Sequence, residues 1–162
     1  MFLLYQRYNP NRLAFADVES VSSGFYVAAI MPTRLTITSV NIDIPIHPAE
    51  ITNNTWADTK KGVSYLVTSP LPGMRGNSVI YGHNYPVIFG NLTSVIPGDV
   101  VTVEFSDGST KSFEVLYTTT VTPDQTGILK QSNDTRLTIY TCSGFLDSER
   151  FVVTAVPLDS HK

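Results

Sequence analysis

The chain has 162 residues, 42% of them hydrophobic, which suits one compact domain that buries most of its surface on folding. Its 11 basic and 14 acidic side chains give a formal net charge of -3 with no basic cluster, which excludes a nucleic-acid-binding surface held by charge. The single cysteine excludes a disulfide within the chain, and too few other soft ligands are present for a structural zinc site.

The beginning of the chain does not form a membrane anchor as it stands. Residues 1–8 are apolar but interrupted by two polar residues, and they are far fewer than the ~20 needed to cross a bilayer. Residues 9–23 have mixed polarity and a weak helix-like pattern. We expect an N-terminal segment at residues 1–31, a folded domain at residues 32–158 and a C-terminal tail at residues 159–162.

Alternating apolar and polar residues predict β-strands in the first half of the domain. The apolar positions of the first runs are Leu35, Ile37, Val40, Ile42, Ile44 and Ile46. Pro45 and Pro48 are expected to limit further strand pairing there. Residues 56–62 are expected to form one helical turn, and residues 69–76 form a loop rich in proline and glycine.

The second half of the domain continues the β pattern. Its expected elements are a strand at residues 78–81, a short helix at 89–95, a strand at 100–105, a hairpin turn at 106–109 and a strand at 111–120. Residues 121–135 form the longest loop-like segment, with a helical turn at 124–129. About eight short strands with little helix predict a closed, mostly antiparallel β-barrel, in which closure protects the strand edges.

The most informative stretch runs from Leu137 to Arg150 and reads LTIYTCSGFLDSER. Its β-branched and aromatic residues suit a strand, and the turn signal directly after Cys142 places that residue at the strand's C-terminal end. A second β-rich run covers residues 151–156, with Arg150 at its entrance. Antiparallel pairing of these two runs would bring Arg150 near Cys142.

Each of these candidate residues also has a purely structural interpretation. Cys142 is either a packed, inert core thiol or a nucleophile, since cysteine is among the most buried residue types. Arg150 is either a functional cation or one partner of a surface salt bridge, for example to Glu149 or Asp147.

The chain has three histidines that are candidates for a catalytic role. A histidine after a strand, such as His83, is often only a hydrogen-bonded loop residue. His47 lies between two prolines and His161 lies in the C-terminal tail, so we expect no rigid element to position either of them. His83 follows a predicted strand directly after Gly82, and it is therefore the preferred candidate.

The ordered set of motifs resembles the sortases, which are cysteine transpeptidases of bacterial surfaces. The segments that carry this resemblance are PTRLTITSVNIDIPI (32–46), GVSYLVTSPLPGMRGNSVIYGHN (62–84), FGNL (89–92), PGDVVTV (97–103) and TIYTC (138–142) with its nearby arginine. The resemblance implies a closed antiparallel or mixed barrel and makes residues 32–158 the catalytic domain. Sortases usually carry an N-terminal transmembrane anchor, which we expect to be absent or truncated here.

The resemblance also implies the chemistry and the residues that perform it. Cys142 would attack a threonine carbonyl of an LPXTG-like sorting signal and form a thioester. His83 would act as general acid and then as base, while Arg150 would hold peptide carbonyls or the oxyanion. The expected substrate-binding residues are Asn84, Thr141 and Ser143. This mechanism requires no metal or organic cofactor, and the acidic residues form no pattern typical of a calcium loop.

The implied partners are a sorting-signal peptide, an amine acceptor such as a cell-wall precursor or a pilin lysine, and the membrane through the missing anchor. The implied location is the extracytoplasmic face of the bacterial cell membrane. Seven residues, 143–149, separate Cys142 from Arg150, fewer than in the long substrate-facing loop of class A and class B sortases. This spacing favours a class D or class E sortase.

Two other function classes stay open on the sequence alone. A cysteine hydrolase would share the thiol and the histidine but transfer the acyl group to water, so added amines would form no product. A β-rich surface-binding module would keep Cys142 as a packed thiol that resists alkylation in the folded protein.

Overall fold

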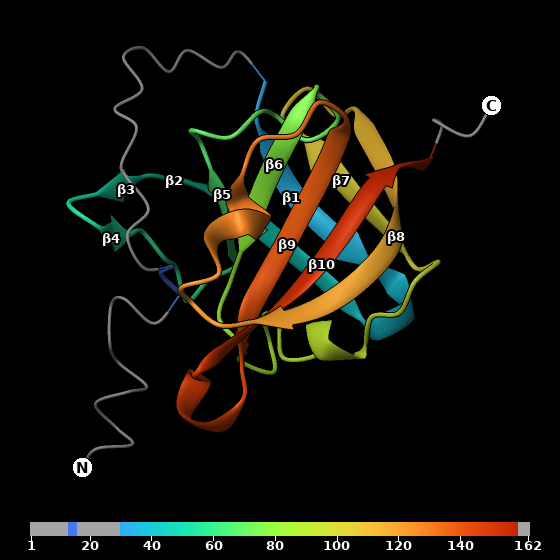
Figure 1. The fold of residues 1–162 in the computed structure, drawn as a ribbon. Coiled ribbons are helices and arrows are strands. Elements are labelled where there is room, and N and C mark those ends of the chain that lie inside the picture. Colours follow the sequence, from blue (N-terminus) through green and yellow to red (C-terminus); the bar gives the residue numbers. More distant parts are fainter. Residues whose placement is uncertain (1–12, 16–29, 159–162) are drawn as a thin grey trace.

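Eight strands close into a barrel in the computed structural model, which describes residues 13–15 and 30–158 (Figure 1). The strands are β1 (Pro32–Ile37), β2 (Ile42–Ala49), β5 (Val63–Leu66), β6 (Gly76–Tyr81), β7 (Val100–Phe105), β8 (Thr110–Val121), β9 (Thr135–Ser143) and β10 (Glu149–Pro157). Their order is β1-β2-β5-β6-β9-β10-β8-β7, and β7 pairs with β1 to close the barrel. The pairs β2–β5 and β6–β9 are parallel and the others antiparallel, which confirms the predicted fold class.

The two faces of the barrel wall bury different sets of side chains. On β9, Leu137 and Ile139 pack in the barrel interior with residues of the other strands. Tyr140 and Cys142 alternate with them and point to the outer side, as the period of two in a strand requires. A second set of buried residues covers this outer side, and we call it the outer cluster: Leu13, Phe15, Ala49, Trp56, Leu66, Val79, Tyr81, Tyr140, Cys142 and Val152.

The expectation that two prolines limit pairing in the first half is wrong. β2 continues through Pro45 and Pro48, and Pro48 pairs with Tyr65 of β5 in the parallel register. A proline removes only its own N–H from a ladder, so a strand tolerates it where that donor has no partner to meet. His47 therefore lies on a rigid strand after all, with its side chain exposed.

The helical turn expected at residues 56–62 is also wrong. Strands β3 (Ile51–Thr52) and β4 (Thr55–Trp56) form a small separate hairpin. Its two turn residues, Asn53 and Asn54, have φ angles of 51° and 59°, a left-handed conformation that asparagine tolerates well. Burial of Trp56 in the outer cluster then holds the following residues close to the barrel wall.

The helical elements within residues 13–15 and 30–158 are short 3₁₀ turns: η1 (Thr38–Val40), η2 (Leu92–Ser94), η3 (Thr126–Leu129) and η4 (Phe145–Asp147). η2 and η3 fall inside the two segments where helical turns were expected, whereas β5 was not expected. The weak helix-like pattern predicted at residues 9–23 lies outside the described residues, except for residues 13–15. Residues 1–8 and His161 also lie outside them.

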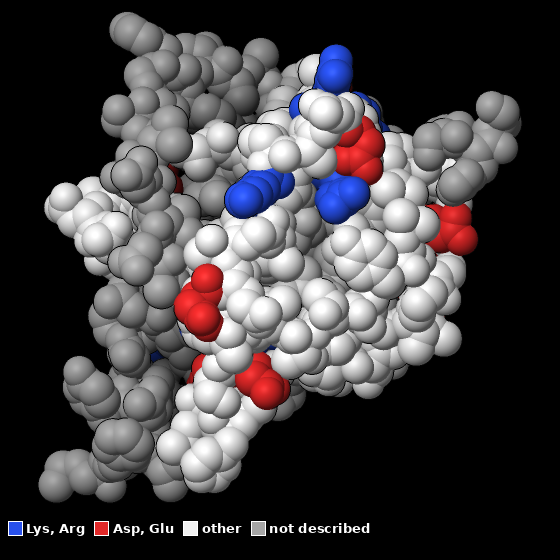
Figure 2. Space-filling view, in the orientation of Figure 1, with Lys and Arg blue, Asp and Glu red and all other residues white. Residues whose placement is uncertain are grey.

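Charged side chains are dispersed over the face drawn in Figure 2, where acidic and basic residues lie beside one another at the upper end. None of the helices in the described part of the chain is long and apolar enough to span a membrane. β9 ends and β10 begins at the lower end of the barrel in Figure 1, opposite the turn between β7 and β8.

Candidate active site

The cysteine lies one residue before the end of β9, directly opposite the first residues of β10. In the antiparallel register, Cys142 pairs with Arg150, as the sequence predicted. The thiol is 1% exposed and belongs to the outer cluster. The Cys142 thiol is thus packed in the strand and also lies beside the buried cation of Arg150.

Parallel pairing brings the histidine to the same end of the barrel. β6 pairs with β9 so that Tyr81 lies opposite Tyr140, and the Gly82 N–H donates to the Tyr140 carbonyl at 3.2 Å. Parallel strands end at the same edge of a sheet, so His83 follows β6 where Cys142 ends β9. The structure therefore brings His83, Cys142 and Arg150 to one end of the barrel.

Two side chains fix the imidazole of His83, which is 3% exposed. Its Nε2 lies 2.6 Å from Oδ2 of Asp58, and its ring stacks on Tyr85 with centroids 4.8 Å apart. Sequence reasoning missed Asp58, because this contact joins residues 25 positions apart and no periodic pattern marks it.

Arg150 is buried and bonded to backbone carbonyl groups. Nη1 donates to the carbonyl oxygens of Asp147 and Glu149 at 2.9 and 3.0 Å, and Nη2 donates to that of Ala14 at 2.9 Å. The guanidinium carbon also lies 5.9 Å from the centre of the Phe15 ring. These bonds go to main-chain oxygens, unlike the surface salt bridge considered from the sequence.

Residues 13–15 lie over the outer side of β9. Leu13 and Phe15 are 1% and 4% exposed, and the Tyr140 hydroxyl donates to the Leu13 carbonyl at 2.9 Å. The Phe15 ring meets the Tyr140 ring edge to face at 5.0 Å. Burial raises the pKa of the Tyr140 hydroxyl well above its usual value, so that it stays protonated and remains a donor. This short segment closes the outer cluster that contains the thiol.

The three expected substrate-binding residues have different surroundings. Thr141 is fully buried, and its hydroxyl donates to the Gly82 carbonyl at 2.7 Å, which ties β9 to the end of β6. Asn84 donates from Nδ2 to the Cys142 carbonyl at 3.2 Å and to Oδ1 of Asp147 at 3.1 Å. Ser143 is half-buried at the end of β9. Asn84 thus joins the loop after β6 to the loop between β9 and β10.

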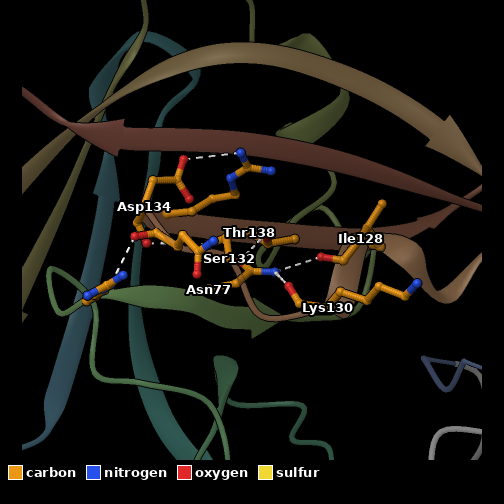
Figure 3. Close-up of polar contacts among 9 residues, drawn as sticks. Asn77, Ile128, Lys130, Ser132, Asp134 and Thr138 are labelled. Carbon is orange, nitrogen blue, oxygen red and sulfur yellow. Dashed lines mark hydrogen bonds and ion pairs between the residues drawn. The ribbon is translucent and has the colours of Figure 1, made fainter.

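The long segment before β9 is held against the outer side of the barrel (Figure 3). Asn77 of β6 is 1% exposed, and its Nδ2 donates to the carbonyls of Ile128 and Lys130 at 2.8 and 3.1 Å. The Thr138 hydroxyl donates to Oδ1 of Asn77 at 2.6 Å. Ile128 and Leu129 then pack against the outer cluster. This segment forms one wall beside the thiol face of β9.

A family model for the sortase domain matches residues 35–158, a region that contains the whole barrel except the start of β1. The chain belongs to the sortase family. Sortases are cysteine transpeptidases that attach surface proteins, and this chain is accordingly a sortase-type cysteine transpeptidase.

Solved sortase structures share the fold. Sortase C-1 from Actinomyces oris is 26% identical with a TM-score of 0.67, and the match covers 96% of this chain and 95% of that chain. Streptococcus agalactiae sortase C1 in complex with MTSET is 24% identical with a TM-score of 0.69, over 82% of this chain and 71% of that one. Clostridium perfringens sortase D5 is 20% identical with a TM-score of 0.68, over 79% of each chain. A search of curated proteins finds no match.

The site contains a thiol, an imidazole paired with a carboxylate, and a buried guanidinium. The thiol and the guanidinium lie on the adjacent strands β9 and β10, the imidazole follows β6, and the carboxylate follows β4. Within residues 13–15 and 30–158, no group of three or more His, Cys, Asp or Glu side chains could hold a metal ion. Such a set of groups can perform acyl transfer through a covalent thioester, since a thiolate attacks carbonyl carbon and a histidine moves the protons.

Proposed function

We propose that this sortase cleaves an LPXTG-like sorting signal and joins its acyl part to an amine at the extracytoplasmic face of the bacterial membrane. The observation that carries the proposal is the meeting of Cys142, His83 and Arg150 at one end of the barrel. All three residues lie inside the region that matches the sortase domain.

In the proposed reaction, the Cys142 thiolate attacks the threonine carbonyl carbon of the signal. The bond between threonine and glycine breaks as protonated His83 gives its proton to the leaving amine, and the acyl group stays on sulfur as a thioester. The acceptor amine then attacks this thioester, His83 takes its proton, and the carbon–sulfur bond breaks to restore the thiolate.

Arg150 supplies donors for the carbonyl oxygens of the peptide in this proposal. Its Nη2 already donates to a backbone carbonyl, that of Ala14, at 2.9 Å. A substrate peptide presents the same chemical group, so a substrate carbonyl can replace the Ala14 oxygen when residues 13–15 move aside. The planar guanidinium suits this role because its donors have a fixed geometry.

The loop between Cys142 and Arg150 supports a class D or class E assignment. Only residues 143–149 separate the two, and η4 occupies part of this short connection. The acceptor that we propose is a cell-wall precursor or a pilin lysine, reached while an N-terminal anchor holds the enzyme at the membrane. Asn84 and Ser143 lie at the end of the barrel where the signal would bind.

Mass spectrometry of the protein mixed with sorting-signal peptides and an amine tests this function. We expect an acyl-enzyme adduct with one peptide motif, followed by a peptide–amine product. A product formed only with water, at every amine concentration, would instead identify a cysteine hydrolase. Peptides that form neither adduct nor product across the whole LPXTG-like set would overturn the proposal.

A further inference from the structure

Neither step of the proposed reaction uses the contact between Asp58 and His83. Oδ2 of Asp58 lies 2.6 Å from Nε2 of His83, well within hydrogen-bond distance. The histidine side chain is 3% exposed and the aspartate side chain 34% exposed, so the pair lies at the edge of the buried site. A pair of this kind differs from two mobile surface charges, because one member cannot move freely.

The chain on the N-terminal side of Asp58 is fixed at each of the two preceding residues. Trp56 is 1% exposed and packs edge to face on Tyr81 with ring centroids 5.3 Å apart. The Ala57 carbonyl accepts a hydrogen bond from the Tyr81 hydroxyl, and the Ala57 N–H donates to the Glu50 carbonyl at 3.2 Å. Burial raises the pKa of Tyr81, so its hydroxyl stays protonated and keeps this bond.

One face of the imidazole is fixed as well. Tyr85 stacks on His83 with an interplanar angle of 8°, and the Phe89 N–H donates to the His83 carbonyl at 3.0 Å. The ring therefore has a defined plane, and Asp58 defines which edge of that plane meets the carboxylate.

A neutral imidazole carries one proton, and a carboxylate can only accept. When the Asp58 carboxylate accepts from Nε2–H, the nitrogen that exchanges a proton with reacting groups is Nδ1. The carboxylate also stabilises the imidazolium that forms each time His83 takes up a proton. In activated nucleophiles generally, a base lies within hydrogen-bond reach of the nucleophile and a third group orients that base.

We propose that Asp58 is a positioning residue for transpeptidation, which holds His83 through Nε2 and reserves Nδ1 for the proton transfers. This inference rests on the proposed function and assigns a third member to the Cys142–His83 pair. Asp58 itself touches neither the thiol nor the peptide in this role.

The first test is the tautomer of His83, which needs no substrate. Long-range ¹H–¹⁵N spectra of histidine-labelled protein distinguish the two ring nitrogens, and His83→Gln identifies the signals of His83 among the three histidines. We expect the neutral ring to carry its proton on Nε2 in the unmodified protein and to lose this preference in Asp58→Ala. An Nδ1–H tautomer in the unmodified protein, or an unchanged spectrum in Asp58→Ala, would overturn the proposal.

The second test uses steady-state kinetics with a transferred peptide. We expect kcat to fall about 10²-fold in Asp58→Ala, because misplaced general acid–base catalysis costs 10²–10⁴-fold, while KM changes little. Asp58→Glu should recover part of kcat and Asp58→Asn should recover less, since only glutamate keeps the charge. Equal kcat values in the unmodified protein and Asp58→Ala would contradict the proposal.

Asp107→Asn is the matched control, because Asp107 lies in the turn between β7 and β8 at the other end of the barrel (Figure 1). It should leave both the His83 spectrum and kcat unchanged. Failure of the proposed function and failure of the positioning role of Asp58 remain distinguishable. If the unmodified protein transfers no peptide, the proposed function fails, and the tautomer alone then decides whether Asp58 positions His83.

Discussion

His83 is the histidine that the geometry favours, and His47 provides a control of equal chemistry. His83 is buried beside Asp58, whereas His47 is exposed on β2. We expect His83→Ala to reduce kcat/KM at least 10²-fold, as for loss of a general acid–base group, and His47→Ala to retain nearly full activity. Peptide-transfer rates of the two variants check this, and equal losses would show that the wrong histidine was chosen.

Arg150 is expected to contribute both to turnover and to stability, because it binds three main-chain oxygens from a buried position. Arg150→Lys keeps the charge but loses the paired donors, so we expect a fall in kcat/KM of about 10²–10³, as when one oxyanion donor is lost. Arg150→Ala should in addition lower Tm, since the carbonyls of Asp147 and Ala14 lose a donor. Near-normal turnover in the lysine variant would remove Arg150 from the active site.

The segment at residues 13–15 belongs to the same buried cluster as the thiol, and we expect it to limit access to Cys142. Phe15 packs against Tyr140 and closes the outer cluster in which Cys142 is 1% exposed. Phe15→Ala should therefore increase the rate at which iodoacetamide alkylates Cys142 in the folded protein. Tyr117→Ala, which changes a half-exposed aromatic residue on β8, serves as control and should not. Equal alkylation rates in all three proteins would mean that this segment does not cover the thiol.

One buried amide, that of Asn77, binds two carbonyl groups of the wall formed by residues 126–134. Asn77→Ala would leave the carbonyls of Ile128 and Lys130 without this donor. We expect a loss of about 1–3 kcal/mol in the free energy of unfolding, together with a higher KM for the peptide. Denaturant unfolding and peptide kinetics measure both effects. Thr138→Val removes only the bond that the Thr138 hydroxyl donates to Oδ1 of Asn77 and leaves both carbonyls with their donor, so it should have a smaller effect. The reverse order would contradict this description of the wall.

At the scale of the whole molecule, the barrel class and the pairing of the last two strands could be predicted from the sequence, whereas β5 and the pairing of β2 through its prolines could not. The periodicity of β9 and β10 and the turn between them placed Arg150 opposite Cys142. The features set by contacts between distant segments could not be predicted. Asp58 meets His83 across 25 positions, and Tyr140 meets the Leu13 carbonyl across 127. Neither contact leaves a periodic signal, and burial of Trp56 overrode the expected helical turn.

The central claim is that a thioester on Cys142 divides between an amine and water. Peptide mapping by mass spectrometry, during turnover at increasing amine concentration, tests this claim most directly. We predict one acylated residue, Cys142, a product that shifts from the hydrolysed to the amine-linked form as amine increases, and no adduct in Cys142→Ala, whose fold should persist. Acylation at another residue, or turnover in Cys142→Ala above background, would contradict the claim.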